Sequence, residues 1–308
     1  MNFVKFRQQL KPWMLPIAMI GGIFLHDIIN KISFITPYLI FVMLVITFCK
    51  VKPNEIKITQ MSWALLVIQI GGAFLSYFII APINQIVAQG IMICFLCPTA
   101  SAAPVVTGML GGSVSRVTSF SIISNLAVAI IAPIIFVKIS INGSDIHSDA
   151  LFDTSIEILH RVAPLLILPM LIAFVLQYLF PKVNKTIASH QGISFYLWSI
   201  ALFIVVGRAV SFIINEPPSE IPSMIYIAIG AAIACILQFW IGRQIGSKYG
   251  DKVAAAQGLG QKNTILAIWM TLTWLHPLAS VGPASYIAWQ NIINSYQLYK
   301  TSRICKKA

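Results

Sequence analysis

Ten apolar stretches follow one another along this chain of 308 residues, and together they account for most of its length. A spanning helix needs about 20 apolar residues to cross roughly 30 Å of hydrocarbon. Only 10% of the residues are charged, against about a quarter in an ordinary soluble domain. The sequence therefore predicts an all-α polytopic membrane protein with ten transmembrane helices, at residues 12–29, 33–49, 61–80, 83–110, 115–137, 162–180, 192–214, 221–242, 252–277 and 279–299.

The basic residues lie at the ends of these stretches, and their distribution predicts the orientation in the membrane. With ten helices, 16 of the 21 lysines and arginines fall on the side of the termini and three on the opposite side. Basic residues are enriched in cytoplasmic loops. We therefore expect both termini in the cytoplasm and the protein in an inner, cytoplasmic-type membrane. The net charge of +12 is spread over separate loops, which argues against a nucleic-acid partner.

The longest loop on the opposite side, at roughly 140–160, ends in an amphipathic pattern. Ile156, Leu159 and Val162 recur there at helical spacing. We expect this segment to form a separate helix that lies along the membrane interface.

The two halves of the chain carry matching patterns. Pro12 and Pro16 open the first stretch, and Pro164 and Pro169 open the sixth, about 153 residues later. The fourth stretch is interrupted by proline and small residues at 97–104, and the ninth by Gly258-Leu-Gly-Gln-Lys-Asn263, about 159 residues later. Five helices in each half require opposite insertion, so we expect two inverted five-helix repeats in which discontinuous helices 4 and 9 cross.

Paired interruptions of this kind indicate a transporter's binding site, because a broken helix frees backbone polar groups that hydrocarbon cannot satisfy. Polar side chains are concentrated at and near the two interruptions. The hydroxyl and amide residues of the fourth and fifth stretches are equally suited to packing between helices. The candidate site residues are Gln257, Gln261, Lys262, Asn263 and Thr264 in the ninth stretch, with Ser101, Thr107, Ser121 and Asn125 from the fourth and fifth.

Cys97-Pro98 with the small residues that follow, and the segment Gly258–Asn263, resemble two motifs of the bile acid:sodium symporter family. That family has Cys-Pro and small residues ending in Ser-Asn in its fourth helix, and Glu-x-Gly-x-Gln-Asn in its ninth. The ten-span layout extends the resemblance over essentially the whole chain.

The resemblance implies one transmembrane unit, residues 1–308, made of two parts. A core would comprise residues 61–137 and 221–299, and a panel would comprise residues 12–49 and 162–214. The panel would rock against the core and expose a site at mid-membrane to each side in turn.

The residues that bind sodium in that family are largely replaced here. Ala103-Pro104 stand where the family has Ser-Asn, and Gly258 aligns with its acidic ligand. Its two hydroxyl ligands on the fifth helix align with Val117 and Ser121, so one of them is lost. Lys262 aligns with a glutamine, and an ammonium group offers no lone pair to a cation. The alignment therefore predicts no sodium site, and no other metal site is expected.

Lys262 falls near the predicted bilayer centre, where an ionisable side chain costs on the order of 2.5–3.5 kcal/mol. We hypothesise that its ammonium stands in the place of sodium and bridges carbonyl groups of the two broken helices. As alternatives, the lysine releases and rebinds a proton in each cycle, or its side chain extends to an aqueous edge. The substitution hypothesis and the proton alternative both predict transport that needs no sodium.

Arg208 is the second cation inside a predicted span. It is a candidate for binding a substrate carboxylate through two parallel hydrogen bonds. The alternative is that its side chain reaches the interface or pairs with an acid in a loop. Together, Lys262 and Arg208 favour a small organic anion as the substrate.

The sequence thus predicts a secondary active transporter of a small organic anion, with no cofactor and no catalytic residues. A proton-coupled exchanger is the alternative within transport, although such exchangers rely on intramembrane aspartates, and none of the nine acids falls at the centre of a predicted span. An intramembrane enzyme is the alternative from another class. It would need an acidic metal cluster or a His-Asp pair, and the sequence offers neither.

Overall fold

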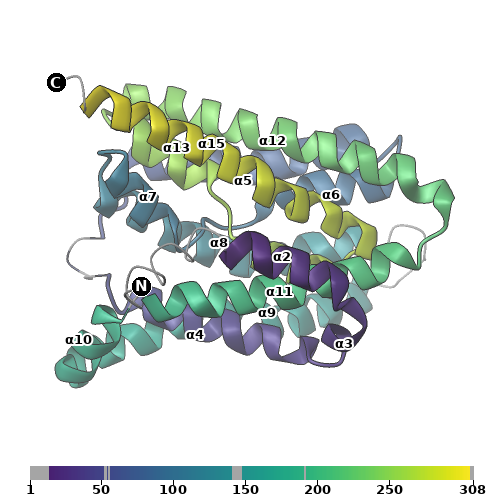
Figure 1. The fold of residues 1–308 in the computed structure, drawn as a ribbon, viewed down its shortest axis with the longest axis horizontal. Coiled ribbons are helices and arrows are strands. Elements are labelled where there is room, and N and C mark those ends of the chain that lie inside the picture. The colour runs from purple at the N-terminus through teal and green to yellow at the C-terminus, as the bar shows by residue number, and fades with distance from the viewer. Residues whose placement is uncertain (1–13, 52–53, 55, 141–147, 191, 306–308) are drawn as a thin grey trace, which may run out of the picture. The chain divides into compact units, whose positions relative to one another are not determined.

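The computed structural model describes residues 14–51, 54, 56–140, 148–190 and 192–305, and these are helical almost throughout (Figure 1). The chain divides into two compact units. The first comprises Met1–Lys50 and Pro169–Pro218, and the second comprises Val51–Leu168 and Ser219–Ala308.

The first unit is built around one long helix, α11 (Gly192–Ile214), against which the other helices of its N-terminal segment pack. A Cβ added at Gly22 of α2 (Met14–Phe24) would lie 2.7 Å from the Phe203 carbonyl oxygen of α11. Glycine at this position therefore lets α2 and α11 approach closely. Small residues serve this purpose in membrane helix pairs. The other elements are α2 (Met14–Phe24), α3 (His26–Asn30), a 3-10 turn at Ser33–Ile35, α4 (Thr36–Phe48), the end of α9 (Ser148–Leu179) and α10 (Pro181–Ser189).

The second unit contains the two interrupted helices and the long helices that surround them. In Figure 1, α15 runs alongside α12, and these two helices are in contact. The elements are α5 (Gln60–Ile80), α6 (Gln85–Leu96), α7 (Ala103–Met109), α8 (Val114–Ser140), the start of α9, the 3-10 turn η4 (Pro218–Glu220), α12 (Ile221–Lys248), α13 (Lys252–Gly260), α14 (Thr264–Trp274), the 3-10 turn η5 (Pro277–Ser280) and α15 (Val281–Cys305).

Several helices of both units are apolar enough for a membrane. Among the described residues, four segments are also long enough to cross one: Gln60–Ile80, Val114–Ile139, Ile158–Leu179 and Pro218–Lys248. Shorter apolar helices occur at Ser33–Phe48, Gln85–Leu96, Ser199–Ile214 and Thr264–Trp274. The helical, apolar architecture is that of a polytopic membrane protein.

Helices α6 and α15 approach each other through glycine. A Cβ added at Gly282 would lie 2.2 Å from the carbonyl oxygen of Gly90, and backbone cannot move aside as a side chain can. We expect Gly282→Ala to lower stability by about 1–3 kcal/mol, the usual cost of overpacking a tight contact. Thermal unfolding of the purified protein in detergent measures this loss.

Gly71→Ala is the matched control for this substitution. Gly71 lies within α5, and a Cβ there would meet no atom within 4 Å. Alanine is also the better helix former, so the unfolding temperature should stay the same or rise slightly. Equal unfolding temperatures for the two variants would contradict the close approach of α6 and α15.

The interfacial helix predicted before residue 162 is wrong as a separate element. Helix α9 runs without interruption from Ser148 to Leu179. This stretch contains no glycine, and Ile158, Leu165 and Leu166 are buried at helical spacing, so one apolar face continues through the expected boundary. Pro164 removes one backbone donor without ending the helix.

Two predictions lie partly outside the described residues. They are the start of the first span, at 12–13, and the part of the long loop at 141–147.

Candidate functional site

The first interruption separates α6 from α7. Helix α6 ends at Leu96, where Cys97-Pro98 follows, and proline can neither donate a backbone hydrogen bond nor fit behind the preceding turn. The helix restarts at Ala103 with Pro104 in its first turn, a position that needs no backbone donor.

The second interruption separates α13 from α14 and has its own cap. Helix α13 ends at Gly260, and α14 begins at Thr264. The side-chain oxygen of Asn263 accepts a hydrogen bond from the backbone N–H of Leu266, at 3.3 Å. Asn263 therefore acts as the N-cap of α14, satisfying one of the donors that a helix start leaves free.

The two interruptions lie side by side and pair through their backbones. Thr99 and Lys262 form an antiparallel β-bridge. The N–H of Ala100 donates to the carbonyl of Gln261 at 2.8 Å, and the N–H of Asn263 donates to the carbonyl of Pro98 at 2.9 Å. The extended residues between the half-helices thus satisfy part of each other's backbone hydrogen bonding.

The carbonyl groups released at the end of α6 accept hydrogen bonds from side chains of two other helices and of the second interruption. Gln238 of α12 donates to the Cys94 carbonyl at 3.1 Å. Gln69 of α5 donates to the carbonyls of Leu96 and Cys97, at 2.9 and 3.1 Å.

Lys262 donates from Nζ to the remaining carbonyl of this turn, that of Phe95, at 2.9 Å. A cation is favoured at a helix C-terminus, where the helix dipole and the free carbonyls are negative. The Lys262 side chain is only 1% exposed, which excludes the alternative that it extends to an aqueous edge.

No carboxylate of the described residues pairs with Lys262. Among the residues that the structure describes, the one salt bridge joins His26 and Asp27, which belong to the first unit. The same described residues contain no group of His, Cys, Asp and Glu side chains suited to a metal ion.

The backbone around the second interruption is satisfied in the same way. The hydroxyl of Thr99 donates to the Gly258 carbonyl at 2.7 Å, and that of Tyr286 to the Gly260 carbonyl at 2.7 Å. The N–H of Lys262 donates to the side-chain oxygen of Gln290 at 3.0 Å. Each of these groups would cost free energy if it were buried without a partner.

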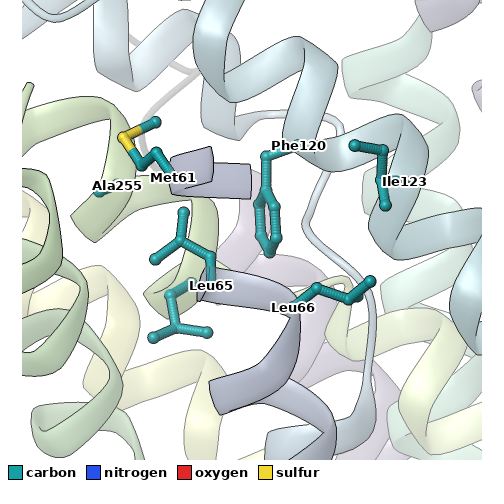
Figure 2. Close-up of a cluster of buried hydrophobic side chains, with 7 residues drawn as sticks. Met61, Leu65, Leu66, Phe120, Ile123 and Ala255 are labelled. Carbon is teal, nitrogen blue, oxygen red and sulfur yellow. The ribbon is translucent and has the colours of Figure 1, made fainter. Parts of the chain in front are cut away.

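Gly258 faces a packed aromatic ring. A Cβ at Gly258 would lie 2.8 Å from the Phe120 ring, which is completely buried. Figure 2 shows that ring among apolar side chains of α5 and α8. A longer side chain at position 258 would require this cluster to repack. The cluster consists of Met61, Leu65, Leu66, Phe120, Ile123, Ala255 and Leu259.

Of the predicted site residues, Gln261, Lys262, Asn263 and Thr264 lie at the crossing itself, and Ser101 lies in the opposing turn. Gln257 instead donates from α13 to side chains of α15, those of Asn294 and Gln297, at 2.9 and 3.1 Å.

Several predicted polar groups on α7, α8, α13 and the second interruption are buried without a hydrogen-bond partner among the described residues. They are the Thr107 hydroxyl and the side-chain oxygens of Asn125, Gln257 and Gln261. Asn125 uses its amide nitrogen to donate to the Ser121 carbonyl at 2.7 Å.

Arg208 belongs to the first unit, on α11. Its guanidinium carbon lies 5.9 Å from the centre of the Phe212 ring, a cation–π contact within one helix face.

The residues of α15 that bind the two interrupted helices from outside were not predicted from the sequence. Tyr286, Gln290, Asn294 and Gln297 follow one another at intervals of three to four residues, so they share one face of α15. A polar face on an apolar span was a signal available in the sequence. Gln69 is harder to find, because it is one glutamine among several in apolar stretches.

A model of the SBF-like CPA transporter family matches residues 52–285, which include both interruptions and the residues paired across them. The chain belongs to this family. The match confirms the resemblance to bile acid:sodium symporters that the two motifs indicate. No curated protein sequence matches the chain at a significant level. Family membership and the apolar helices together identify a multi-pass membrane transporter.

Proposed function

We propose that this member of the SBF-like CPA transporter family is a secondary transporter of a small organic anion that works without sodium. The protein would lie in an inner, cytoplasmic-type membrane with both termini in the cytoplasm. In this proposal the Lys262 ammonium takes the place of the coupling cation.

The observation that carries the proposal is that four consecutive carbonyls at the end of α6 accept hydrogen bonds from protein side chains. Cys94, Phe95, Leu96 and Cys97 each accept a hydrogen bond from a protein side chain. Sodium would need several such oxygens as ligands, and it would have to compete there with the donors Lys262, Gln69 and Gln238. Lys262 also brings a positive charge to the same place, so a second cation would be repelled.

The position of Gly258 supports the same conclusion. The resemblance aligns this residue with an acidic sodium ligand, and here the Phe120 ring fills the space that such a side chain would enter. Ala103, which aligns with a serine ligand, is completely buried and has no hydroxyl. Two of the oxygen ligands that the resemblance implies for sodium are thus absent from this chain.

We propose that transport follows an alternating-access cycle. The second unit would be the core that carries the crossing, and the first unit the panel. The paired interruptions support two inverted five-helix repeats, since binding sites of such transporters lie where broken helices meet. The crossing would then behave as one rigid body, because its backbone groups are satisfied within the second unit.

Arg208 of the first unit favours an organic anion as the substrate. Arg208 has an aromatic neighbour on its own helix and makes no ion pair in the described part of the chain, so its guanidinium is suited to a substrate carboxylate. The N-terminal ends of the half-helices α7 and α14 also favour negative charge.

Proton-coupled exchange is the second candidate. It is favoured by one observation, the absence of a carboxylate partner for Lys262 among the described residues. Without a fixed counter-ion, the amine can exchange its proton when the site opens to water. Transport would then depend steeply on pH, and that dependence would disappear in Lys262→Gln.

The test is uptake into proteoliposomes. A thermal-shift screen of taurocholate and small monocarboxylic and dicarboxylic acids, with and without sodium and across pH, selects the probes. Uptake of a stabilising acid should then be equal with sodium or choline outside the vesicles, and Arg208→Gln should reduce it. A steep requirement for a sodium gradient would refute the proposal.

A further inference from the structure

Apart from the crossing, the second unit contains a pocket of about 850 Å³ between α5, α6 and α8. This volume lies in the upper part of the roughly 300–1,000 Å³ typical of small-molecule sites. All its lining residues belong to the second unit, and most are apolar, with Phe74, Tyr77 and Phe78 of α5 forming an aromatic wall.

The aromatic wall is open on its outer side. Phe78 is 68% exposed, and its ring stacks on that of Phe74 with their centres 6.3 Å apart. Ile134 of α8 lines the same pocket and is 49% exposed. Helices α5 and α8 are long and apolar enough to cross a membrane, and there the exposed surface at the mouth of the pocket would face hydrocarbon.

One cation stands in this lining. Lys138 lies in the last turn of α8, is exposed, and makes no ion pair with the described residues. Helix α5 ends at Ile80 and α6 begins at Gln85. The turn between these two helices lines the same pocket as Lys138, so polar backbone groups of the helix ends lie at this part of the lining. A lysine at a helix end extends its ammonium to the lipid headgroup region.

We propose that this pocket binds an anionic phospholipid, with an acyl chain between α5 and α8 and the phosphate on Lys138. A lipid fits the combination of an apolar cavity, a mouth that faces hydrocarbon and a single cation at its edge. Each buried methylene contributes to binding, and one lysine near the surface adds attraction for an anionic headgroup. A water-soluble anion would gain little from the aromatic wall.

Native mass spectrometry of the full-length protein, released from phosphatidylcholine nanodiscs containing phosphatidylglycerol, tests the proposal. The wild-type protein should retain phosphatidylglycerol. Lys138→Gln should weaken this retention about fivefold, as expected for the loss of one lysine at the membrane surface. Because Lys138 is exposed, the substitution removes charge without repacking the core.

Two further variants distinguish lipid binding in the pocket from non-specific attraction of anionic lipid to surface lysines. Ile134→Trp fills the mouth and keeps the charge, so it should also reduce retention; its side chain has room because Ile134 is half exposed. Lys248→Gln removes an exposed lysine at the end of α12, away from the lining, and should leave retention unchanged. Glycerophosphate in large excess, which carries the headgroup charge without acyl chains, should not compete.

Three outcomes would overturn the proposal: equal retention of phosphatidylcholine, equal losses in Lys138→Gln and Lys248→Gln, or displacement by glycerophosphate. The last would indicate a site for soluble anions.

Discussion

Lys262→Gln is expected to destabilise the protein by about 1–3 kcal/mol without creating a requirement for sodium. Glutamine is too short to reach the Phe95 carbonyl, which would be left buried without a donor. Removing a buried charge also relieves its desolvation, but that cost is shared by the unfolded state, whose helices remain in the membrane. The unsatisfied carbonyl should therefore dominate, and the free energy of unfolding should fall. Thermal unfolding with sodium or with choline measures both effects.

Lys252→Gln is the control for this substitution. Lys252 is an exposed lysine at the start of the same half-helix, α13, so its loss removes one charge but leaves the crossing intact. Its unfolding temperature should match that of the wild-type protein. If sodium stabilised Lys262→Gln selectively, the ligand set for sodium would still be present, and the proposed role of Lys262 as a substitute for the ion would be wrong.

The places where the helices break could be predicted from the sequence because their causes are local. Pro98 cannot continue a helix, and Gly258 and Gly260 weaken one, and neither effect depends on the neighbouring helices. The burial of Lys262 could also be expected from its place within an apolar stretch. Its partner, the Phe95 carbonyl, follows once the two breaks lie side by side.

The partners supplied by other helices could not be predicted in this way. Gln238 and Cys94 are 144 residues apart in the sequence. The register of α12 against α6 depends on close packing at Gly230, because an added Cβ there would lie 2.2 Å from the Ile91 side chain. The sequence pattern shows that such helices pack, but not in which register. The same limit applies to Phe120, whose contact with Gly258 depends on the packing of α8 against α13.

Gln69→Leu is expected to destabilise the protein more than Lys262→Gln does, by about 3 kcal/mol or more. Gln69 is completely buried, donates to the carbonyls of Leu96 and Cys97, and accepts from the Ser124 hydroxyl at 2.9 Å. Leucine would fill similar space but leave the two carbonyls without these donors and the Ser124 hydroxyl proton without its acceptor. Each buried group so orphaned costs about 1–3 kcal/mol, and partial relaxation makes the sum smaller than three full penalties.

Ser124 extends the effect of losing Gln69 to the second interrupted helix. Its hydroxyl oxygen also accepts from the N–H of Thr99, whose own hydroxyl donates to the Gly258 carbonyl. Loss of Gln69 should therefore loosen both interruptions, and amide hydrogen exchange should increase at residues 94–100 and 258–263 together. Gln60→Leu, at the exposed start of the same helix, should change neither exchange nor unfolding. Faster exchange confined to residues 94–100 would contradict the coupling, because it would mean that the two half-helix pairs open independently.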